Sequence, residues 1–447
     1  MHPVVAVAVA LAVVLIIVLP RKYVIYPLVV VAIFAPFGQQ AYILGVHFYD
    51  TRLLFMAGWV RLFRAVLTSS RSVLVGGFNE MDKAFVLWVV FRTFAGVVYY
   101  RGNSADIVYQ AGFFIDAIGG YFLMRYLIQD EEDIFRFIKL CACLVAVLGI
   151  SMTFEKMRAI NPFGLIGGRL TPDIREGSVR AQGPFGVSIL AGVYGATLLS
   201  LFVLLWKSGK AKLLAVTGMV GSTLMVLGCS SSTPLFAYLA VVFGICCWPV
   251  RKRMKLILRG VAACLVVLHL VMKAPVWFLI ARVDLIAGNS GYHRARLIDQ
   301  AIMHFRDWWL FGTDQAFSWG DDMWDLSNQF VAEAETGGLL TFICFVALIA
   351  FCFRRIGKAR KMVEGDTQRE WFFWLLGVAM LSHVAAFFGI SYWDQIRITW
   401  FGMFAIVAAA TVPLFSTQTV TEEIRPKFNM GVSTSRPAGV TSRRSLS

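Results

Sequence analysis

The chain has 447 residues, of which 58% are hydrophobic and 15% are charged, whereas about a quarter of the residues of a soluble globular protein are charged. This composition excludes an ordinary soluble domain and predicts one membrane domain, because about 20 apolar residues in a helix cross a bilayer. The net charge is +15, but Lys and Arg gather in short clusters between apolar runs, as membrane-orientation signals do, so nucleic acid is not an expected partner.

Thirteen apolar runs follow one another along the chain, and each has the composition of a membrane helix. They lie at about residues 4–19, 23–37, 53–63, 84–99, 107–127, 135–153, 187–206, 213–227, 235–248, 256–280, 330–353, 371–390 and 396–414. The first run has no basic residue before it and Arg21-Lys22 after it, which is the wrong polarity for a cleaved signal peptide. We expect it to be a span with its N-terminus outside. The run at 53–63 is short, and an interfacial position is the alternative.

The basic clusters give the expected orientation. They lie at residues 21–22, 61–71, 125–139, 207–212, 251–259 and 354–361. When about 13 spans are passed through the membrane in alternating directions, these connections all lie on one side. The positive-inside rule predicts that this side is cytoplasmic. We therefore expect an all-α fold, a polytopic membrane helical bundle of about 12–13 spans, over residues 1–415. Residues 416–447 are rich in Ser, Thr and Arg without apolar periodicity and predict a disordered cytoplasmic tail.

The same threading places two long connections, residues 154–185 and 282–328, on the outer face. Each is too short to be a domain of its own, so we expect the two outer-face loops to form a cap over the bundle.

The second outer loop contains a predicted helix from Tyr292 to Trp309. Helical spacing puts Arg294 on a stripe with Ile298, Ala301, Ile302, Phe305 and Trp309, which predicts that it points toward the membrane body. Arg296 shares its stripe with Asp299, Gln300, Met303 and Asp307, which predicts a solvated ion-pair residue. A cation against an apolar face needs an anion. Arg294 therefore either contacts lipid headgroups or holds a phosphate through its planar fork of donors.

The first outer loop carries Arg175 and Arg180, and Arg180 precedes Gly183-Pro184 and an apolar helix. A cation and free backbone N–H groups at a helix start can converge on an anion. Glu155 follows the preceding span directly, so it lies near the outer surface and is a candidate base if it is partly desolvated. The alternative is a solvated carboxylate next to Lys156 and Arg158.

Two charged residues lie about halfway through consecutive spans, Arg92 and Asp116. Consecutive spans run antiparallel, so the two side chains should lie at similar depth. We expect a structural ion pair, with a proton or substrate path as the alternative. Asp394, Gln395 and Arg397 in the last outer turn are expected to add polar groups to the outer face.

The cysteines and histidines give no sign of a metal site. All eight cysteines lie within or at the edge of apolar segments and lack the paired spacing of zinc ligands. The histidines within and between the apolar runs show no metal-like clustering. We expect neither a metal ion nor a cofactor.

Three short motifs follow one another in the region 155–353. The first is Arg180-Ala-Gln-Gly-Pro-Phe185 before a span, the second is Arg294 with Gly312 downstream, and the third is Asp325-Leu-Ser-Asn328 followed by Gly337-Gly338-Leu339. In this order they resemble the O-antigen ligase and O-antigen polymerase family of bacterial envelope glycan assembly. The remaining spans agree with that family in hydropathy and number.

The resemblance implies a GT-C-like glycosyltransferase of the bacterial inner membrane, multi-pass, with its C-terminus in the cytoplasm. Its donor would be a polyprenyl-pyrophosphate-linked oligosaccharide and its acceptor a glycan, at the outer face among membrane lipids. A chain-length regulator and a flippase are the implied protein partners.

The resemblance also implies roles for particular residues. Arg180 and Arg294 would bind the pyrophosphate, and Asn328 would orient a sugar hydroxyl or the loop. Glu155 or Asp325 would assist the acceptor, with Arg175, Gly183, Arg296 and Ser327 in support. Ser327 stands where ligases of this family carry His, and a serine hydroxyl is a poor general base. This departure favours a polymerase over a ligase.

Two other function classes remain open on sequence grounds. The first is a lipid-glycan flippase or polytopic transporter, in which Arg92 and Asp116 would matter more than the outer loops, although no internal repeat is visible. The second is a non-catalytic envelope scaffold.

Overall fold

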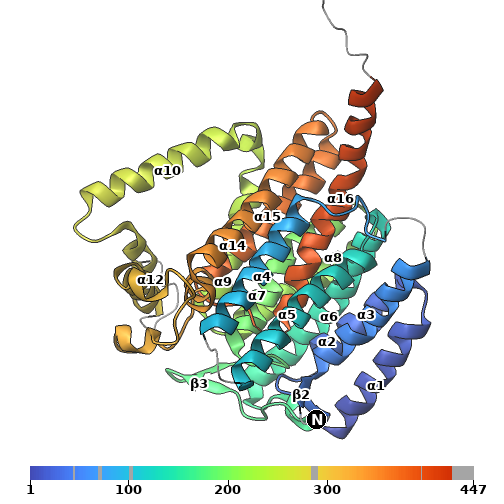
Figure 1. Ribbon diagram of the computed structural model, residues 1–447, viewed down its shortest axis with the longest axis horizontal. Coiled ribbons are helices and arrows are strands. Elements are labelled where there is room, and N and C mark those ends of the chain that lie inside the picture. The colour runs from blue at the N-terminus through green and yellow to red at the C-terminus, as the bar shows by residue number, and fades with distance from the viewer. Residues whose placement is uncertain (44–45, 69–72, 100–103, 283–289, 394, 425–447) are drawn as a thin grey trace, which may run out of the picture.

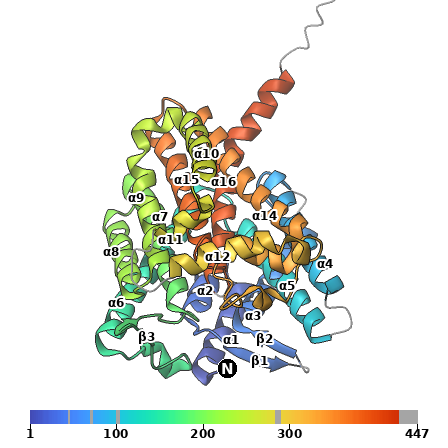
Figure 2. The same cartoon turned by 90° about the vertical axis from the view of Figure 1, so that its left-hand side faces the viewer.

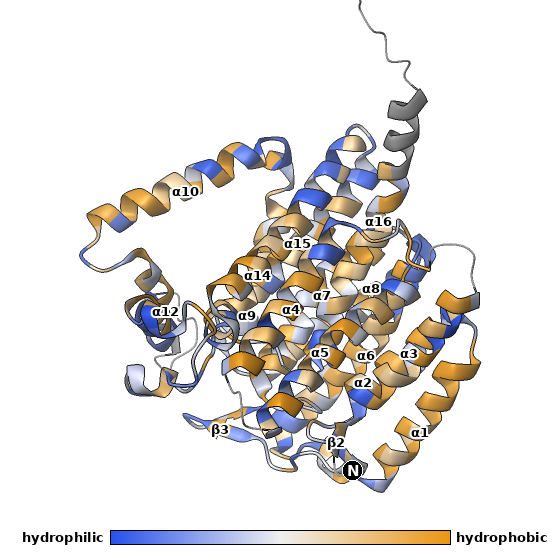
Figure 3. Ribbon diagram, viewed as in Figure 1, coloured by the Kyte–Doolittle hydropathy of each residue, from blue (hydrophilic) through white to orange (hydrophobic). Residues whose placement is uncertain are grey.

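The computed structural model describes residues 1–447 except 44–45, 69–72, 100–103, 283–289, 394 and 425–447. Most of its helices pack side by side in one bundle and consist mainly of hydrophobic residues (Figures 1 and 3), many of which are exposed. The first half consists of α1 (Pro3–Val18), α2 (Arg21–Phe34), α3 (Asp50–Thr68), α4 (Glu80–Tyr99), α5 (Ser104–Leu127) and α6 (Glu131–Arg158).

The second half begins with α7 (Ser188–Lys207), α8 (Lys212–Gly228), α9 (Ser232–Cys246), the 3-10 turn η2 (Trp248–Arg253) and α10 (Met254–Val271). It ends with α14 (Gln329–Met362), α15 (Thr367–Phe387) and α16 (Ile396–Ile424). Each of the predicted apolar runs lies mainly within one of these helices. The all-α class is therefore confirmed.

Not every helix of the bundle is long enough to cross a bilayer unaided. Within the described ranges, seven helices are long and apolar enough to span a membrane: α5, α6, α7, η2 with α10, α14, α15 and α16. Three more, α1, α8 and α9, are apolar but have only 15–17 residues. At 1.5 Å per residue they are shorter than a hydrocarbon core of about 30 Å.

The end of the bundle that carries the outer loops, here called the cap end, is joined by side-chain hydrogen bonds. It carries the hairpin β1 (Gln40–Ile43) and β2 (Val46–Tyr49), the turn η1 (Pro162–Ile166), and the hairpin β3 (Asp173–Arg175) and β4 (Ser178–Arg180). Gln395 Nε2 donates to Ala35 O at 2.9 Å and to Pro184 O at 3.1 Å. These bonds tie the start of α16 to the connections after α2 and β4.

The opposite end of the bundle holds the basic connections. Arg21 of the α1–α2 turn donates to Leu127 O at 3.0 Å and pairs with Asp133 at 2.7 Å, and Lys210 of the α7–α8 turn pairs with Glu131 at 2.8 Å. Arg251 pairs with Glu370 at 2.7 Å. The connections that the threading groups on one side therefore lie at one end of the bundle.

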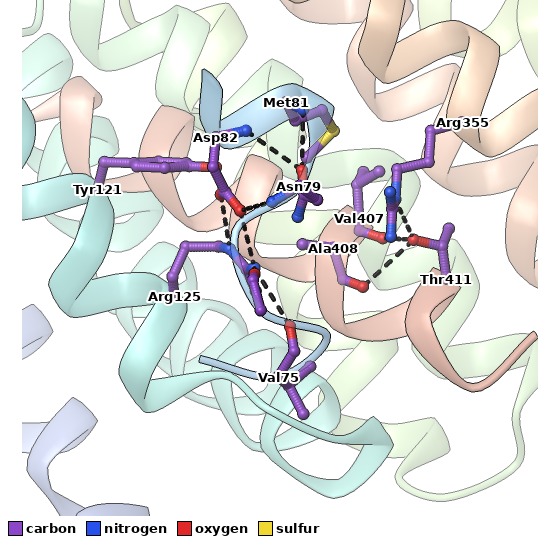
Figure 4. Close-up of polar contacts among 11 residues, drawn as sticks. Val75, Asn79, Met81, Asp82, Tyr121, Arg125, Arg355, Val407, Ala408 and Thr411 are labelled. Carbon is purple, nitrogen blue, oxygen red and sulfur yellow. Dashed lines mark hydrogen bonds and ion pairs between the residues drawn. The ribbon is translucent and has the colours of Figure 1, made fainter. Parts of the chain in front are cut away.

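A charged pair is completely buried near this opposite end (Figure 4). Arg125 Nε lies 3.0 Å from Asp82 Oδ1, and both side chains are 0% exposed. Asp82 also accepts hydrogen bonds from the Tyr121 hydroxyl and, at 2.8 Å, from Asn79 N. A buried charge needs a partner of opposite sign, so this pair ties α4 to α5.

Several short helices lie between α10 and α14, in and just before the expected second outer loop. They are η3 (Val276–Phe278), α11 (Leu279–Arg282), α12 (Ser290–Met303), α13 (Phe305–Trp308) and η4 (Ala316–Trp319). Figure 2 shows α12 lying across the face of the bundle. The predicted helix from Tyr292 to Trp309 is therefore present, although it is interrupted at His304.

The cap is anchored in a break of α14. Gly338 has φ +75°, and the chain there leaves the helical conformation. The freed backbone groups bond to the cap, because Leu339 N donates to Trp309 O at 2.9 Å and Thr313 N donates to Glu335 O at 2.7 Å. The glycines of the second and third motifs thus meet at one junction.

Two expected boundaries differ from the structure. Residues 154–158 form the last turn of α6, so Glu155 is on a helix and the first outer loop begins after Arg158. The α6 helix ends at Ala159, whose φ of +54° is left-handed. Near the C-terminus, α16 continues through residues 416–424, which the sequence predicts to belong to the disordered tail. The rest of that tail lies outside the described residues.

Candidate functional site

The turn at residues 180–185 is held by two buried side chains. Glu155 Oε1 accepts from Gln182 N at 3.1 Å, and its Oε2 accepts from Gly183 N at 2.8 Å. Asn161 Nδ2 donates to Gly183 O at 2.7 Å. Gly183 has φ +57°, a conformation that favours glycine because it has no Cβ. The sequence Arg-x-x-Gly-Pro therefore folds into a fixed turn on the end of α6.

This geometry changes the expected role of Glu155. Its side chain is 0% exposed, so the solvated alternative is wrong. Both of its oxygens accept backbone N–H groups of the turn, which makes it a support for Arg180. The neighbouring Lys156 donates to Val179 O at 3.3 Å and to the Ser230 hydroxyl. The end of α6 therefore fixes β4 and the turn that follows it.

Arg175 and Arg180 line one cavity. Its volume is about 240 Å³, and it lies between the β3–β4 hairpin and the α8–α9 connection. The other lining residues are Glu176, Ser178, Val226, Leu227, Ser230 and Leu235. Two arginines, one glutamate, two serines and three apolar residues therefore line the same space.

Arg180 is a cation in an unfavourable environment for its charge. Burial lowers its pKa from the ordinary arginine value, and the nearby Arg175 lowers the pKa further. Its Nε is buried without a hydrogen-bond partner in the described part of the chain. A desolvated arginine beside a second arginine is an environment that an anion would stabilise.

The structure places Arg294 on α12, away from the residues that line this cavity. Arg294 is buried at 7% exposed, as the sequence predicts, but its stripe is not the predicted one. Ile302, Phe305 and Trp309 are 41–49% exposed. The buried face of the cap carries Ala301 of the predicted stripe together with Ala295, Leu297 and Trp308. The structure therefore brings Arg175, and not Arg294, next to Arg180.

Arg296 also differs from its expectation. The end of its guanidinium approaches Gly320, where an added Cβ would lie 2.8 Å from it. Asp299, its expected ion partner, accepts a hydrogen bond from Trp277 Nε1 at 3.1 Å. Arg296 therefore packs across the cap toward the end of η4.

The third motif forms the start of α14. Asn328 Oδ1 accepts from Phe330 N at 2.9 Å and Val331 N at 3.2 Å, which makes Asn328 the N-cap of the helix. Ser327 is buried, and its N–H donates to Asp325 O at 2.8 Å. The Asp325 side chain is exposed, and its backbone carbonyl lies 3.1 Å from His293 Nε2 of α12. The motif thus connects the cap to the bundle.

The expected ion pair between Arg92 and Asp116 is wrong. Arg92 pairs with Glu333 at 3.4 Å, and Asp116 pairs with Arg52 at 2.7 Å. Equal depth does not decide pairing, because α14 packs against α4 and α3 packs against α5, so each supplies a nearer partner. Sequence reasoning missed Arg52 and Glu333, although both are charged residues near the ends of helices.

The last connection at the cap end is ordered by its polar groups. Arg397 Nε donates to Tyr392 O at 3.2 Å, and Tyr392 N donates to Gln329 Oε1. Asp394, which the sequence assigns to the outer face, lies outside the described residues. In the part of the chain that is described, no three His, Cys, Asp or Glu side chains are placed to hold a metal ion.

Comparison with protein families and with curated proteins finds no relative of this chain. No protein-family model matches the sequence, and no curated protein is significantly similar to it.

Proposed function

We propose that the protein is a membrane glycosyltransferase that polymerises polyprenyl-pyrophosphate-linked oligosaccharide units at the outer face of a bacterial inner membrane. One observation carries this proposal: Arg175 and Arg180 line the same cavity at the cap end. Arginine binds phosphate oxygens through parallel N–H donors. Two arginines in one partly desolvated cavity therefore suit a diphosphate better than a single phosphate or a neutral sugar.

Besides these two cations, the proposed glycosyl transfer needs only the donor, the acceptor hydroxyl and a proton acceptor. The acceptor hydroxyl oxygen forms a bond to the anomeric carbon of the donor, and the bond from that carbon to the phosphate oxygen breaks. The diphosphate leaves with the bonding electron pair and stays attached to the polyprenol, and the hydroxyl proton passes to solvent or to a base. Arg175 and Arg180 stabilise the charge that develops on the leaving diphosphate.

The remaining candidates take supporting roles in this proposal. Glu155 and Gly183 fix the turn that carries Arg180, and Asn328 fixes the start of α14. Arg294 lies on α12 and does not line this cavity, so Arg175 takes the place that the motif order implies for it. Asp325 has an exposed carboxylate and is therefore the candidate general base. Ser327 in place of a histidine favours polymerisation over ligation.

The test uses purified protein in lipid nanodiscs with the lipid-linked glycan that accumulates when the gene is deleted in its host. Arg180→Ala should lower the rate of glycan extension about 100-fold or more, because one lost charge-stabilising donor costs about that much. Arg180→Lys should recover only part of the rate, since lysine cannot bind two oxygens in the fork geometry. Arg175→Ala should lower the rate as well.

Arg169→Ala is the matched control. Arg169 lies in the same outer loop and pairs at 2.7 Å with Asp173 on the exposed surface. Its loss should leave extension within about twofold of wild type. Extension by the Arg180→Ala variant at the wild-type rate and abundance would refute the assignment.

A second candidate, a lipid-glycan flippase or transporter, has one observation in its favour. Four charged side chains, paired as Arg92–Glu333 and Arg52–Asp116, lie within the helices, and such groups often mark transport paths. The adjoining cavity is only about 20 Å³, however, which is room for about one water molecule. Movement of the glycan across a vesicle membrane without its extension would favour this candidate.

A further inference from the structure

The helix α10 stands off from the rest of the bundle. None of its residues is buried, although it belongs to one of the seven segments that can span a membrane. Figure 1 shows it apart from α14 and α15, and Figure 2 shows it in front of them. Its surface is almost entirely apolar toward the cap and basic toward the opposite end (Figure 3).

The separation of α10 from the bundle is fixed by the fold, because contacts hold both ends of the helix in place. At the basic end, Trp248 stacks on Trp371 of α15 with ring centroids 3.8 Å apart, and Arg251 pairs with Glu370 at 2.7 Å. At the cap end, His269 Nδ1 accepts from Val276 N at 3.3 Å, and Trp277 Nε1 donates to Asp299 of α12 at 3.1 Å. The helix is therefore attached to the protein at its two ends, and none of the residues between them is buried.

The basic end of α10 carries more cations than the protein neutralises. Arg251 and Lys252 have carboxylate partners, Glu370 and Glu364, at 2.7 and 3.0 Å. Lys255 and Arg259 are exposed, and neither forms an ion pair within the described residues. They are four residues apart and so lie on one helix face.

The first turns of α10 also leave space for a ligand. Gly260 follows Arg259, and a Cβ added there would have no heavy atom within 4 Å. Leu258, Val266 and Leu270 lie on the same helix face as Lys255 and Arg259 and add apolar surface that is 59–77% exposed. Two cations at the mouth of an apolar surface match a molecule with an anionic headgroup and acyl chains.

We propose that Lys255 and Arg259 bind the phosphate of an anionic phospholipid, whose acyl chains lie along the same face of α10. The lipid fills the space that α10 leaves and supports the helix, which in turn carries α11 and α12 of the cap. This inference does not rest on the proposed glycosyltransferase activity.

The experiment compares lipid binding by native mass spectrometry after delipidation and titration with phosphatidylglycerol or phosphatidylcholine. Each basic residue near a membrane surface contributes about 1 kcal/mol to binding an anionic lipid. The Lys255→Gln/Arg259→Gln variant should therefore bind phosphatidylglycerol about 30-fold more weakly than wild type. Its binding of phosphatidylcholine should change little.

The control variant is Arg354→Gln/Lys361→Gln. Both residues are exposed near the same end of the bundle on α14, so the control removes the same net charge. It should bind phosphatidylglycerol as wild type does. Equal loss of binding in the two variants would show a general charge effect and overturn the site, as would wild-type binding by the α10 variant.

Two further measurements separate the lipid from other occupants. Inorganic phosphate and glycerol phosphate should not displace the lipid at millimolar concentration, and displacement by either would overturn the lipid assignment. A photo-reactive amino acid at Val266, which is 59% exposed, should cross-link to lipid in membranes. A cross-link to another protein or to a second copy of the chain in its place would also overturn it.

Discussion

At the scale of single residues, Asn328 shows how one side chain can be mistaken for part of a reaction centre. Its position in a short polar motif suggests contact with a sugar. In the structure its Oδ1 accepts two backbone N–H groups at the start of α14. An N-cap and a substrate ligand need the same residue types, because both use a short polar side chain with a free oxygen.

Substitution of Asn328 separates these two roles. Asn328→Ala should destabilise the protein by about 1 kcal/mol, because two N–H groups lose their acceptor. Asn328→Asp keeps the acceptor and should keep the stability, measured by thermal unfolding in detergent. If Asn328→Asp extends glycan at the wild-type rate, the residue acts only as a cap. A wild-type unfolding temperature for Asn328→Ala would contradict the capping role.

At the scale of elements, the break in α14 decides how the cap is attached. A continuous helix would use its own backbone groups and leave none for the cap. Because Gly338 adopts φ +75°, Leu339 N is free to donate to Trp309 O. Gly312 meets the other side of the break, where a Cβ would lie 2.0 Å from Glu335 O. Both glycines are therefore required by close backbone contact.

Gly338→Ala should loosen the cap. The added Cβ would lie 2.4 Å from Leu310 O, and alanine is strained at this φ. We expect a loss of about 2 kcal/mol or more, with faster protease cleavage in residues 310–328. Gly357→Ala is the control, since Gly357 lies in α14 with open space around it and alanine favours helices. Equal protease resistance of the two variants would argue against the junction.

At the scale of the whole molecule, buried ion pairs set how the helices are arranged. Arg125 and Asp82 are both 0% exposed, and they join α4 to α5. Breaking such a pair leaves one charge without a partner in a medium that solvates it poorly. The pair therefore discriminates against other arrangements of these apolar helices, whose apolar surfaces are otherwise alike.

Arg125→Met should destabilise the protein by about 3–5 kcal/mol, because Asp82 remains buried and charged. The double variant with Asp82→Asn should recover part of the loss, since no charge is then left unpaired. Arg369→Ala breaks an exposed pair with Asp366 and should change stability by less than about 1 kcal/mol. Thermal unfolding of the three variants in one detergent gives the comparison. A similar loss in Arg125→Met and Arg369→Ala would contradict this account.

The helical class, the position of each apolar run and the grouping of the basic connections at one end could all be predicted from the order of the amino acids. These properties follow from local composition and periodicity, which a short segment carries without its neighbours. The sequence also located the turn at Arg180, because Gly183-Pro184 restricts the backbone there.

The pairing of the charged side chains could not be predicted in this way and depends on how the helices pack. Arg92 pairs with Glu333 and Asp116 pairs with Arg52, and Glu155 supports a turn instead of facing solvent. Partners on different helices depend on helix order, rotation and tilt, and none of these has a local signal in the chain. For the same reason the neighbour of Arg180 in its cavity is Arg175, and the free-standing position of α10 became visible only once all the helices were packed.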